Sequence, residues 1–169
     1  MDGRTEIETM KSRTTTERTS DRELVVTRTV NAPARSVFDA WTKPELLQRW
    51  WVPKSLGMSL VSCEIDARSG GGYRFKFTHP DFPQPMEFFG KYLEVKPPTR
   101  LVWTNEEAAE AGQVTTVTFE EKAGGQTKVV VHDLYPSKDA LDAAIASGSA
   151  YGVGEEMFEQ LDALLASVH

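Results

Sequence analysis

The chain has 169 residues, of which 40% are hydrophobic and 26% are charged, and its formal net charge at pH 7 is −6. This length suits one domain with a single substantial core, and the composition is that of an ordinary globular protein. The negative charge, without a basic stripe interleaved with aromatic residues, argues against nucleic-acid binding. No apolar run reaches the roughly 18 residues of a membrane span, and the N-terminus lacks the apolar segment of a secretory signal.

Cysteine and histidine usage excludes several kinds of site. Cys63 is the single cysteine, so no internal disulfide forms, and we expect a reducing, cytoplasmic location and an inert thiol. His79, His132 and His169 are scattered without the spacing of a metal site. The sequence also has no nucleophile elbow, no phosphate loop and no dinucleotide-binding glycine motif after a strand. We therefore expect no metal, no cofactor and no assignable catalytic residue.

Residues 1–22 are rich in threonine, arginine and glutamate and carry few apolar side chains. Such a segment buries too little surface to offset the entropy lost on ordering. We expect a flexible leader, with a short added strand as the less favoured alternative. The folded domain is expected at residues 23–169.

The first elements of the domain are a strand and two short helices. Residues 23–30 are β-branched and predict a strand, and residues 32–41 have apolar side chains at helical spacing. Pro44 begins a second short helix, which contains Trp50 and Trp51. Adjacent helical positions point about 100° apart. We therefore expect one of these rings in the core and the other at its rim.

A run of antiparallel strands follows. Residues 73–77 alternate between Tyr73, Phe75 and Phe77 on one face and arginine and lysine on the other, which predicts a half-buried strand. The other strand patterns lie at residues 58–65, 86–95, 100–104, 114–121 and 127–134.

The tail of the chain is predicted to be helical. Residues 138–148 favour a short helix. Beyond it apolar side chains and a glycine recur at steps of three and four, which is typical of one long amphipathic helix; they are Tyr151, Gly154, Phe158, Leu161, Leu165 and Val168. The order of elements predicts an α+β fold. A curved antiparallel sheet of six or seven strands wraps around the C-terminal helix, with two short helices after the first strand.

Several segments carry a resemblance to a known family: "VVTRTVNAPARSVFDAWTKPELLQRWW", "GGGYRF", "FFGKYLEV", "TTVTFEEKAGGQTKVVVH" and "SGSAYGVGEEMFEQLDALLA". Over residues 23–167 the chain resembles the SRPBCC (START-like, helix-grip) superfamily. Within it, the chain is similar to bacterial proteins related to the C-terminal domain of the activator of the heat-shock-protein-90 ATPase. The resemblance implies a helix-grip fold with a cavity between the sheet and the last helix. Members share this fold and cavity rather than one reaction.

The resemblance and the strand faces give a set of candidate ligand-binding residues. A functional pocket needs an apolar lining and a few convergent polar groups, for which Arg28, His132, Tyr92 and Tyr151 are the candidates. Core packing alone explains most of the aromatic candidates, and a lone histidine in an apolar strand is more often structural. The candidates are Trp50, Trp51, Phe75, Phe77, Phe88, Tyr92, Trp103, His132, Tyr151, Gly154 and Phe158.

Three functions remain open at this point. We favour binding of a small hydrophobic or amphipathic molecule in the cavity. A co-chaperone-like interaction domain for a chaperone of the ninety-kilodalton class is the second interpretation. It is weaker because the eukaryotic activator also uses a separate chaperone-binding domain, and 169 residues hold one domain. The third, a polyketide-cyclase-like enzyme, requires a well-placed acid or base. The ligand and the choice between monomer and homodimer stay open.

Overall fold

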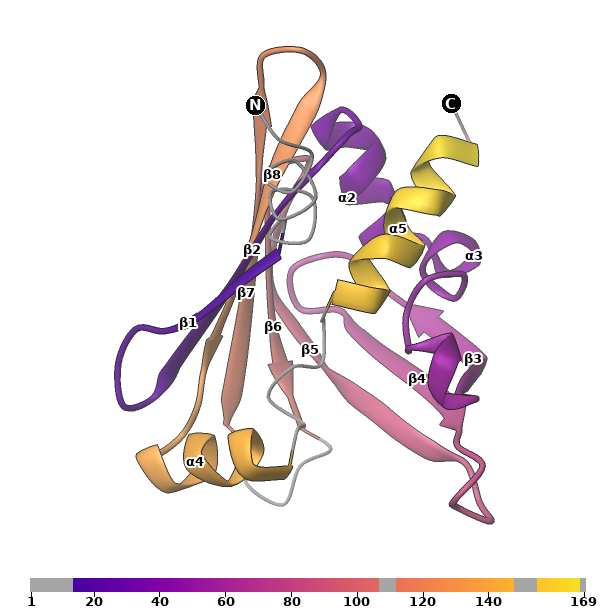
Figure 1. Cartoon of the computed structure of the whole chain (residues 1–169), viewed down its shortest axis with the longest axis vertical. Coiled ribbons are helices and arrows are strands. Elements are labelled where there is room, and N and C mark those ends of the chain that lie inside the picture. The colour runs from indigo at the N-terminus through magenta and orange to yellow at the C-terminus, as the bar shows by residue number, and fades with distance from the viewer. Residues whose placement is uncertain (1–13, 107–111, 148–154, 168–169) are drawn as a thin grey trace, which may run out of the picture.

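The computed structural model describes residues 14–106, 112–147 and 155–167. Eight antiparallel strands form one sheet in the order β1-β2-β8-β7-β6-β5-β4-β3. Helices α2, α3 and α5 lie on one side of the sheet toward one end, and α4 lies at the other end (Figure 1). The α+β helix-grip prediction is therefore confirmed, with eight strands in place of six or seven.

The strands are β1 (Thr14–Arg18), β2 (Glu23–Val30), β3 (Ser59–Ile65), β4 (Gly72–Thr78), β5 (Met86–Lys96), β6 (Arg100–Asn105), β7 (Gln113–Lys122) and β8 (Gln126–Leu134). The helices are α2 (Ala34–Thr42), α3 (Pro44–Leu47), the 3₁₀ turn η1 (Lys54–Leu56), α4 (Lys138–Ser147) and α5 (Glu155–Ser167). None of these described helices is long and apolar enough to cross a membrane.

The eighth strand lies in the segment expected to be a flexible leader. Thr14–Arg18 pairs with β2 over five residue pairs, so the leader prediction is wrong for these residues. An edge strand is held by backbone hydrogen bonds, which its polar side chains do not reveal. Two side-chain contacts add to the pairing. Arg28 Nη1 donates to Thr14 Oγ1 at 2.6 Å, and Arg18 forms an ion pair with Asp142 of α4 at 2.8 Å. Residues 1–13 lie outside the described residues.

One face of the sheet, here called the inner face, packs against α2 and α5. Alternate residues of β4 show the pattern, with Tyr73, Phe75 and Phe77 buried and Arg74 and Lys76 exposed, as the sequence predicts. The side chains of α5 that complete this core are Met157, Phe158, Leu161, Leu164 and Leu165.

A buried ion pair joins α5 to the sheet. Arg28 on β2 is only 2% exposed, and its Nη2 lies 2.5 Å from Asp162 Oδ2 on α5. Glu155 at the start of α5 lies 3.5 Å from Nη1 of the same guanidinium. The guanidinium also lies over the Phe158 ring, 5.7 Å from its centroid. A buried charge needs such partners because its desolvation is otherwise uncompensated.

The two adjacent tryptophans follow a shorter helix than expected, since α3 ends at Leu47 rather than near residue 51. Pro44 has no N–H to offer the Ala40 carbonyl near the end of α2. Trp50 is fully buried and supplies the missing donor, with its Nε1 2.9 Å from Ala40 O. Trp51 is only half-buried, so the two rings occupy different environments.

Trp41 on α2 is the centre of an aromatic cluster at this end of the molecule. Its ring centroid lies 4.8 Å from Trp50, 5.8 Å from Trp51 and 6.0 Å from Trp103. Phe119 on β7 lies 5.9 Å away on another side. These contacts pack α2 and the loop after α3 against the central strands.

The first prediction concerns β1. Deleting residues 1–18 should lower the free energy of unfolding by more than about 1–2 kcal/mol, beyond an ordinary point mutation, because it removes the pairing with β2 and a partner of buried Arg28. Urea denaturation followed by circular dichroism measures this. The single variant Thr14→Val in the full chain should lose about 1 kcal/mol. Unchanged stability of the shortened chain would show that β1 is dispensable.

The second prediction compares the adjacent tryptophans. Trp50→Phe should lower the free energy of unfolding by about 2–4 kcal/mol, because it leaves a void and a buried carbonyl without its donor. Trp51→Phe should lower it by about 1 kcal/mol, since this ring is half-buried. Equal losses in chemical denaturation would contradict the assigned role of the Trp50–Ala40 hydrogen bond.

Candidate functional site

Three aromatic side chains form a continuous apolar surface on the inner face of β4, β5 and β6. The ring centroids of Tyr73 and Tyr92 are 5.8 Å apart, and Trp103 lies 6.3 Å from Tyr73 and 6.4 Å from Tyr92. All three side chains are buried. They belong to neighbouring strands, with Tyr92 directly opposite Trp103 and Tyr73 directly opposite Gly90.

Gly90 permits the close approach of these strands. A Cβ atom at this position would lie 1.9 Å from the Thr104 carbonyl oxygen and 2.9 Å from the Tyr73 hydroxyl. The Tyr73 hydroxyl instead passes over the glycine and donates to Thr104 O at 2.8 Å. Backbone that approaches this closely is a position where only glycine fits.

Next to the aromatic surface, three polar side chains interrupt the apolar inner face. This polar cluster consists of Asn105 on β6, Thr115 on β7 and Asp133 on β8. Asn105 Nδ2 donates to Thr115 Oγ1 at 2.8 Å, and Thr115 Oγ1 donates to Asp133 Oδ1 at 2.5 Å. Thr115 lies directly opposite both Trp103 and Asp133 in the strand register, so the polar and aromatic groups share one row across the sheet.

Burial perturbs the carboxyl group of this cluster. Desolvation raises the pKa of Asp133 above its ordinary value, while hydrogen bonds from Thr115 and Gln113 and the nearby charge of His132 offset part of that shift. The residue nevertheless keeps part of its surface accessible. A buried carboxyl group with a raised pKa is a candidate for a functional site.

Three further titratable groups on or near this face, two tyrosines and the cysteine, hold their protons more tightly than usual. Burial raises the pKa of Tyr92 well above its usual range. Burial and the neighbouring Asp133 raise the pKa of Tyr135 to about 12, and burial with the charge of Glu45 raises that of Cys63 to about 12. A thiol of this kind is a poor nucleophile. No group of three metal-ligating side chains occurs among the residues that the structure describes.

The candidate aromatic residues do not gather at one place. Trp51 and Phe75 pack together with centroids 6.0 Å apart, beside the surface formed by Tyr92 and Trp103. Phe77 and Phe88 stack on each other at 4.4 Å farther along β4 and β5. The remaining placements are separate: Trp50 is buried under α2, Phe158 lies beneath Arg28, and Tyr151 and Gly154 lie outside the described residues.

His132 is not on the inner face, contrary to its selection as a polar lining group. Val129 and Val131 of β8 are buried, so His132 points to the opposite face, where its Nε2 lies 2.6 Å from Glu23 Oε2. The next residue, Asp133, takes the inner position that the sequence analysis gave to the histidine. The period of two along a strand, counted from Val129, was the signal that identifies it.

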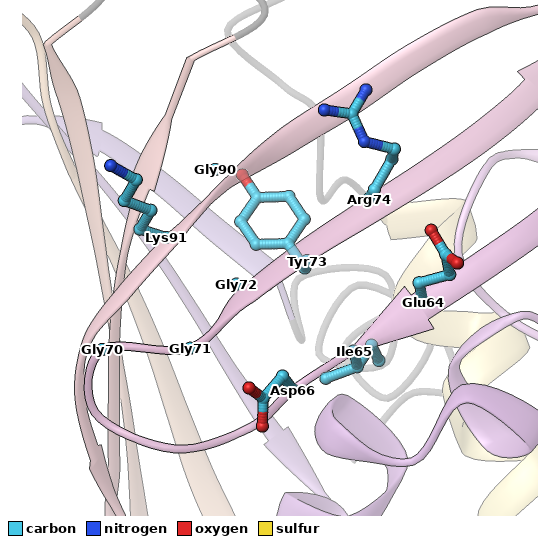
Figure 2. A pocket seen from close by; sticks show the side chains of 10 residues that line it. All are labelled: Glu64, Ile65, Asp66, Gly70, Gly71, Gly72, Tyr73, Arg74, Gly90 and Lys91. Carbon is cyan, nitrogen blue, oxygen red and sulfur yellow. The ribbon is translucent and has the colours of Figure 1, made fainter.

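Figure 2 shows a recess away from this cluster, beside the turn between β3 and β4, with a volume of about 550 Å³. Its charged side chains are exposed, and two of them pair with residues outside the lining, since Arg74 bonds Glu87 and Asp66 bonds Arg68. Much of the remaining wall is glycine backbone. Ligand sites combine an apolar lining with convergent polar groups, so this recess is the weaker candidate. It is lined by Glu64, Ile65, Asp66, Gly70, Gly71, Gly72, Tyr73, Arg74, Gly90 and Lys91.

The third prediction concerns the buried carboxyl group. Because the folded-state pKa of Asp133 is raised, the protonated form stabilises the fold at low pH, and this stabilisation is lost as the pH rises through that pKa. Asp133→Asn should therefore be more stable than the wild type at neutral pH, with the difference shrinking at acidic pH. Urea denaturation across a pH series measures the difference. A variant less stable at every pH would contradict the assigned desolvation.

Comparison with known proteins places the chain in a family. A family model described as "Activator of Hsp90 ATPase homolog 1-like protein" matches residues 31–166. No curated protein matches the chain. Among solved structures, a Rhodobacter sphaeroides protein is 25% identical with a TM-score of 0.82, over 92% of this chain and 99% of that one. A Staphylococcus epidermidis protein is 27% identical with a TM-score of 0.74, over 92% and 95%.

A more distant structure, described as an AHSA1-like protein from Aeromonas hydrophila, is 18% identical with a TM-score of 0.65, over 85% of this chain and 93% of that one, and shows the same fold. The resemblance stated from the sequence motifs is thus confirmed. Because the family model spans most of the described domain, the chain belongs to the family of Activator of Hsp90 ATPase homolog 1-like proteins.

Proposed function

We propose that the protein binds a small amphipathic molecule against the inner face of the sheet, between α5 and the end of the sheet near α4. The observation that carries this proposal is the polar cluster of Asn105, Thr115 and Asp133 beside Tyr92 and Trp103. An apolar surface with a few convergent polar groups is the usual composition of a small-molecule site.

The position of the cluster supports binding rather than fold stability. Asp133 is the penultimate residue of β8, and α4 begins at Lys138, so the cluster lies at the α4 end of the strands. Arg28 and its partners on α5 lie farther along the same face, because Arg28 is opposite Val129. A row of apolar side chains would stabilise this part of the sheet without a desolvated carboxyl group. Residues that lower stability, such as a buried carboxyl group, are common where a functional site requires them.

An enzyme of the cyclase type would need an acid or base on the inner face. His132 does not qualify because it faces the other way, and buried Tyr92 holds its proton too tightly. Asp133 is the inner-face group with the chemistry for such a role. Binding does not require a proton transfer, so it is the simpler function for the same residues.

A co-chaperone-like role is the second candidate, because the matching family model is described by the activator of the Hsp90 ATPase. Its direct test is the ATPase rate of a bacterial chaperone of the ninety-kilodalton class with and without the protein. Stimulation that persists in Thr115→Val would favour this role over the binding of a small molecule.

The fourth prediction tests binding itself. A molecule that binds only the folded state raises stability by RT ln(1 + [L]/Kd), about 2.7 kcal/mol at a hundredfold excess over Kd. Thermal denaturation with a panel of small aromatic amphiphiles should therefore give hits. Flat responses across the panel would overturn the proposal.

A matched pair of threonine variants tests whether the ligand binds on the inner face. Thr115 faces inward in the polar cluster, whereas Thr116 is on the outer face opposite His132. Thr115→Val should weaken the hits, because it removes the hydroxyl group that orients Asn105 and Asp133, and Thr116→Val should leave them unchanged. In NMR titrations, chemical-shift changes should gather at the inner face of β6, β7 and β8. Changes gathered instead around Gly70–Gly72 would move the site to the recess of Figure 2.

A further inference from the structure

We infer that the ligand is an aromatic molecule that presents a hydrogen-bond donor to Asp133, with a protonated amine preferred over a hydroxyl group and a carboxylate rejected. This inference rests on the proposed function, because it specifies the chemistry of the same site. It separates the protein from binders of fatty acids and other anionic amphiphiles. The argument comes from the direction of the hydrogen bonds, the distribution of charge and the neighbouring rings.

The hydrogen bonds of the polar cluster all run toward Asp133. Thr115 donates its single hydroxyl proton to Asp133 Oδ1 at 2.5 Å. The threonine oxygen can then only accept from Asn105, which fixes the orientation of that amide, with Nδ2 toward the threonine. The cluster thus ends in an acceptor.

Acceptor capacity remains at the carboxylate. Thr115 and Gln113 are the hydrogen-bonding side chains around Asp133 within the described ranges. A carboxylate has about four acceptor positions, so a ligand donor can occupy another of them. A ligand that offers only acceptors finds no matching group at Asp133.

The distribution of charge on the inner face also favours a ligand with a hydrogen-bond donor. Arg28, the buried cation of this face, is already paired with Asp162 and lies close to Glu155. In the part of the chain that the structure describes, no lysine or arginine forms an ion pair with Asp133. An anionic head group placed beside this carboxylate would be repelled, whereas a cation would be attracted strongly because water is largely excluded. A cationic group bound here would favour the ionised form of Asp133, which burial otherwise disfavours.

The aromatic surface favours a ligand that has a flat ring as well as a positive charge. Tyr92 and Trp103 lie on neighbouring strands in the same cross-strand row as Thr115 and Asp133. Aromatic rings pack against a planar ligand, and their electron-rich faces also attract a cation within about 6 Å. A flat ring that carries an ammonium group satisfies both features.

The experiment uses three probes with the same ring and different head groups: 2-(aminomethyl)naphthalene, 2-naphthol and 2-naphthoate. Their dissociation constants for the wild-type protein are measured by titration calorimetry near neutral pH. We expect the amine to bind most tightly and the naphthoate most weakly. The amine and naphthoate should differ by at least about tenfold, which corresponds to 1.4 kcal/mol. This ranking needs no variant, so it does not depend on how any substitution folds.

Two carboxyl-to-amide variants assign the preference to Asp133. Asp133→Asn should weaken the amine about tenfold and bring the amine and naphthoate within about threefold of each other. Asp142→Asn is the matched control, because Asp142 lies on α4 and pairs with Arg18 and Lys138, outside the polar cluster. It should preserve the wild-type ranking.

The outcomes separate the two proposals. If none of the probes binds, the proposed function is wrong and this inference falls with it. If the probes bind but naphthoate equals or exceeds the amine, binding stands and the inferred ligand chemistry is wrong. A preference for the amine that survives Asp133→Asn would likewise overturn the role given to Asp133.

Discussion

One-sided burial of the sheet is the constraint on which the rest of this structure depends. Side chains alternate along every strand, so each strand gives one set of residues to the inner face and the other set to the outer face. The inner set must be covered, and α2 and α5 provide the cover. A shift of one residue in any pairing would exchange the two sets. The alternation therefore fixes which polar groups are buried as firmly as it fixes the apolar core.

Two charged side chains of the inner face, Arg28 and Asp133, have opposite kinds of surroundings. Arg28 is almost fully buried, and its charge is met by Asp162 on α5, which ties the helix to β2. Asp133 is met by neutral hydrogen-bond donors, which only partly offset the rise in its pKa caused by burial. The first arrangement is what a fold needs to hold a buried charge. The second leaves Asp133 without a lysine or arginine partner among the described residues.

Near α2, one missing backbone hydrogen-bond donor explains how the loop after α3 is held. Pro44 removes the N–H that Ala40 O would receive, and Trp50 replaces it from farther along the chain. Gln160 on α5 then donates to the carbonyl oxygens of Trp50 and Val52, both at 2.9 Å. The loop after α3 is therefore held by both helices. This end is closed by aromatic packing, and the polar cluster lies toward the other end.

The sequence by itself determined the strands, the order of elements and much of the face pattern. Alternation in Tyr73–Phe77, together with the glycine and proline turns, is a local property that needs no knowledge of partners. The same alternation predicts that Asp133 rather than His132 faces inward, once Val129 and Val131 are assigned to the core. Residue type alone favours a histidine as a polar lining group, but the alternation places His132 on the outer face.

Only the tertiary structure decided which distant residues meet. Asn105, Thr115 and Asp133 are 10 and 18 residues apart in sequence, and the register of three strands brings them together. Backbone pairing also decided the strand Thr14–Arg18, because an edge strand can form without apolar side chains. Periodicity reports the environment of one strand at a time, whereas a site depends on the register between strands. That register is set by the packing of the whole sheet.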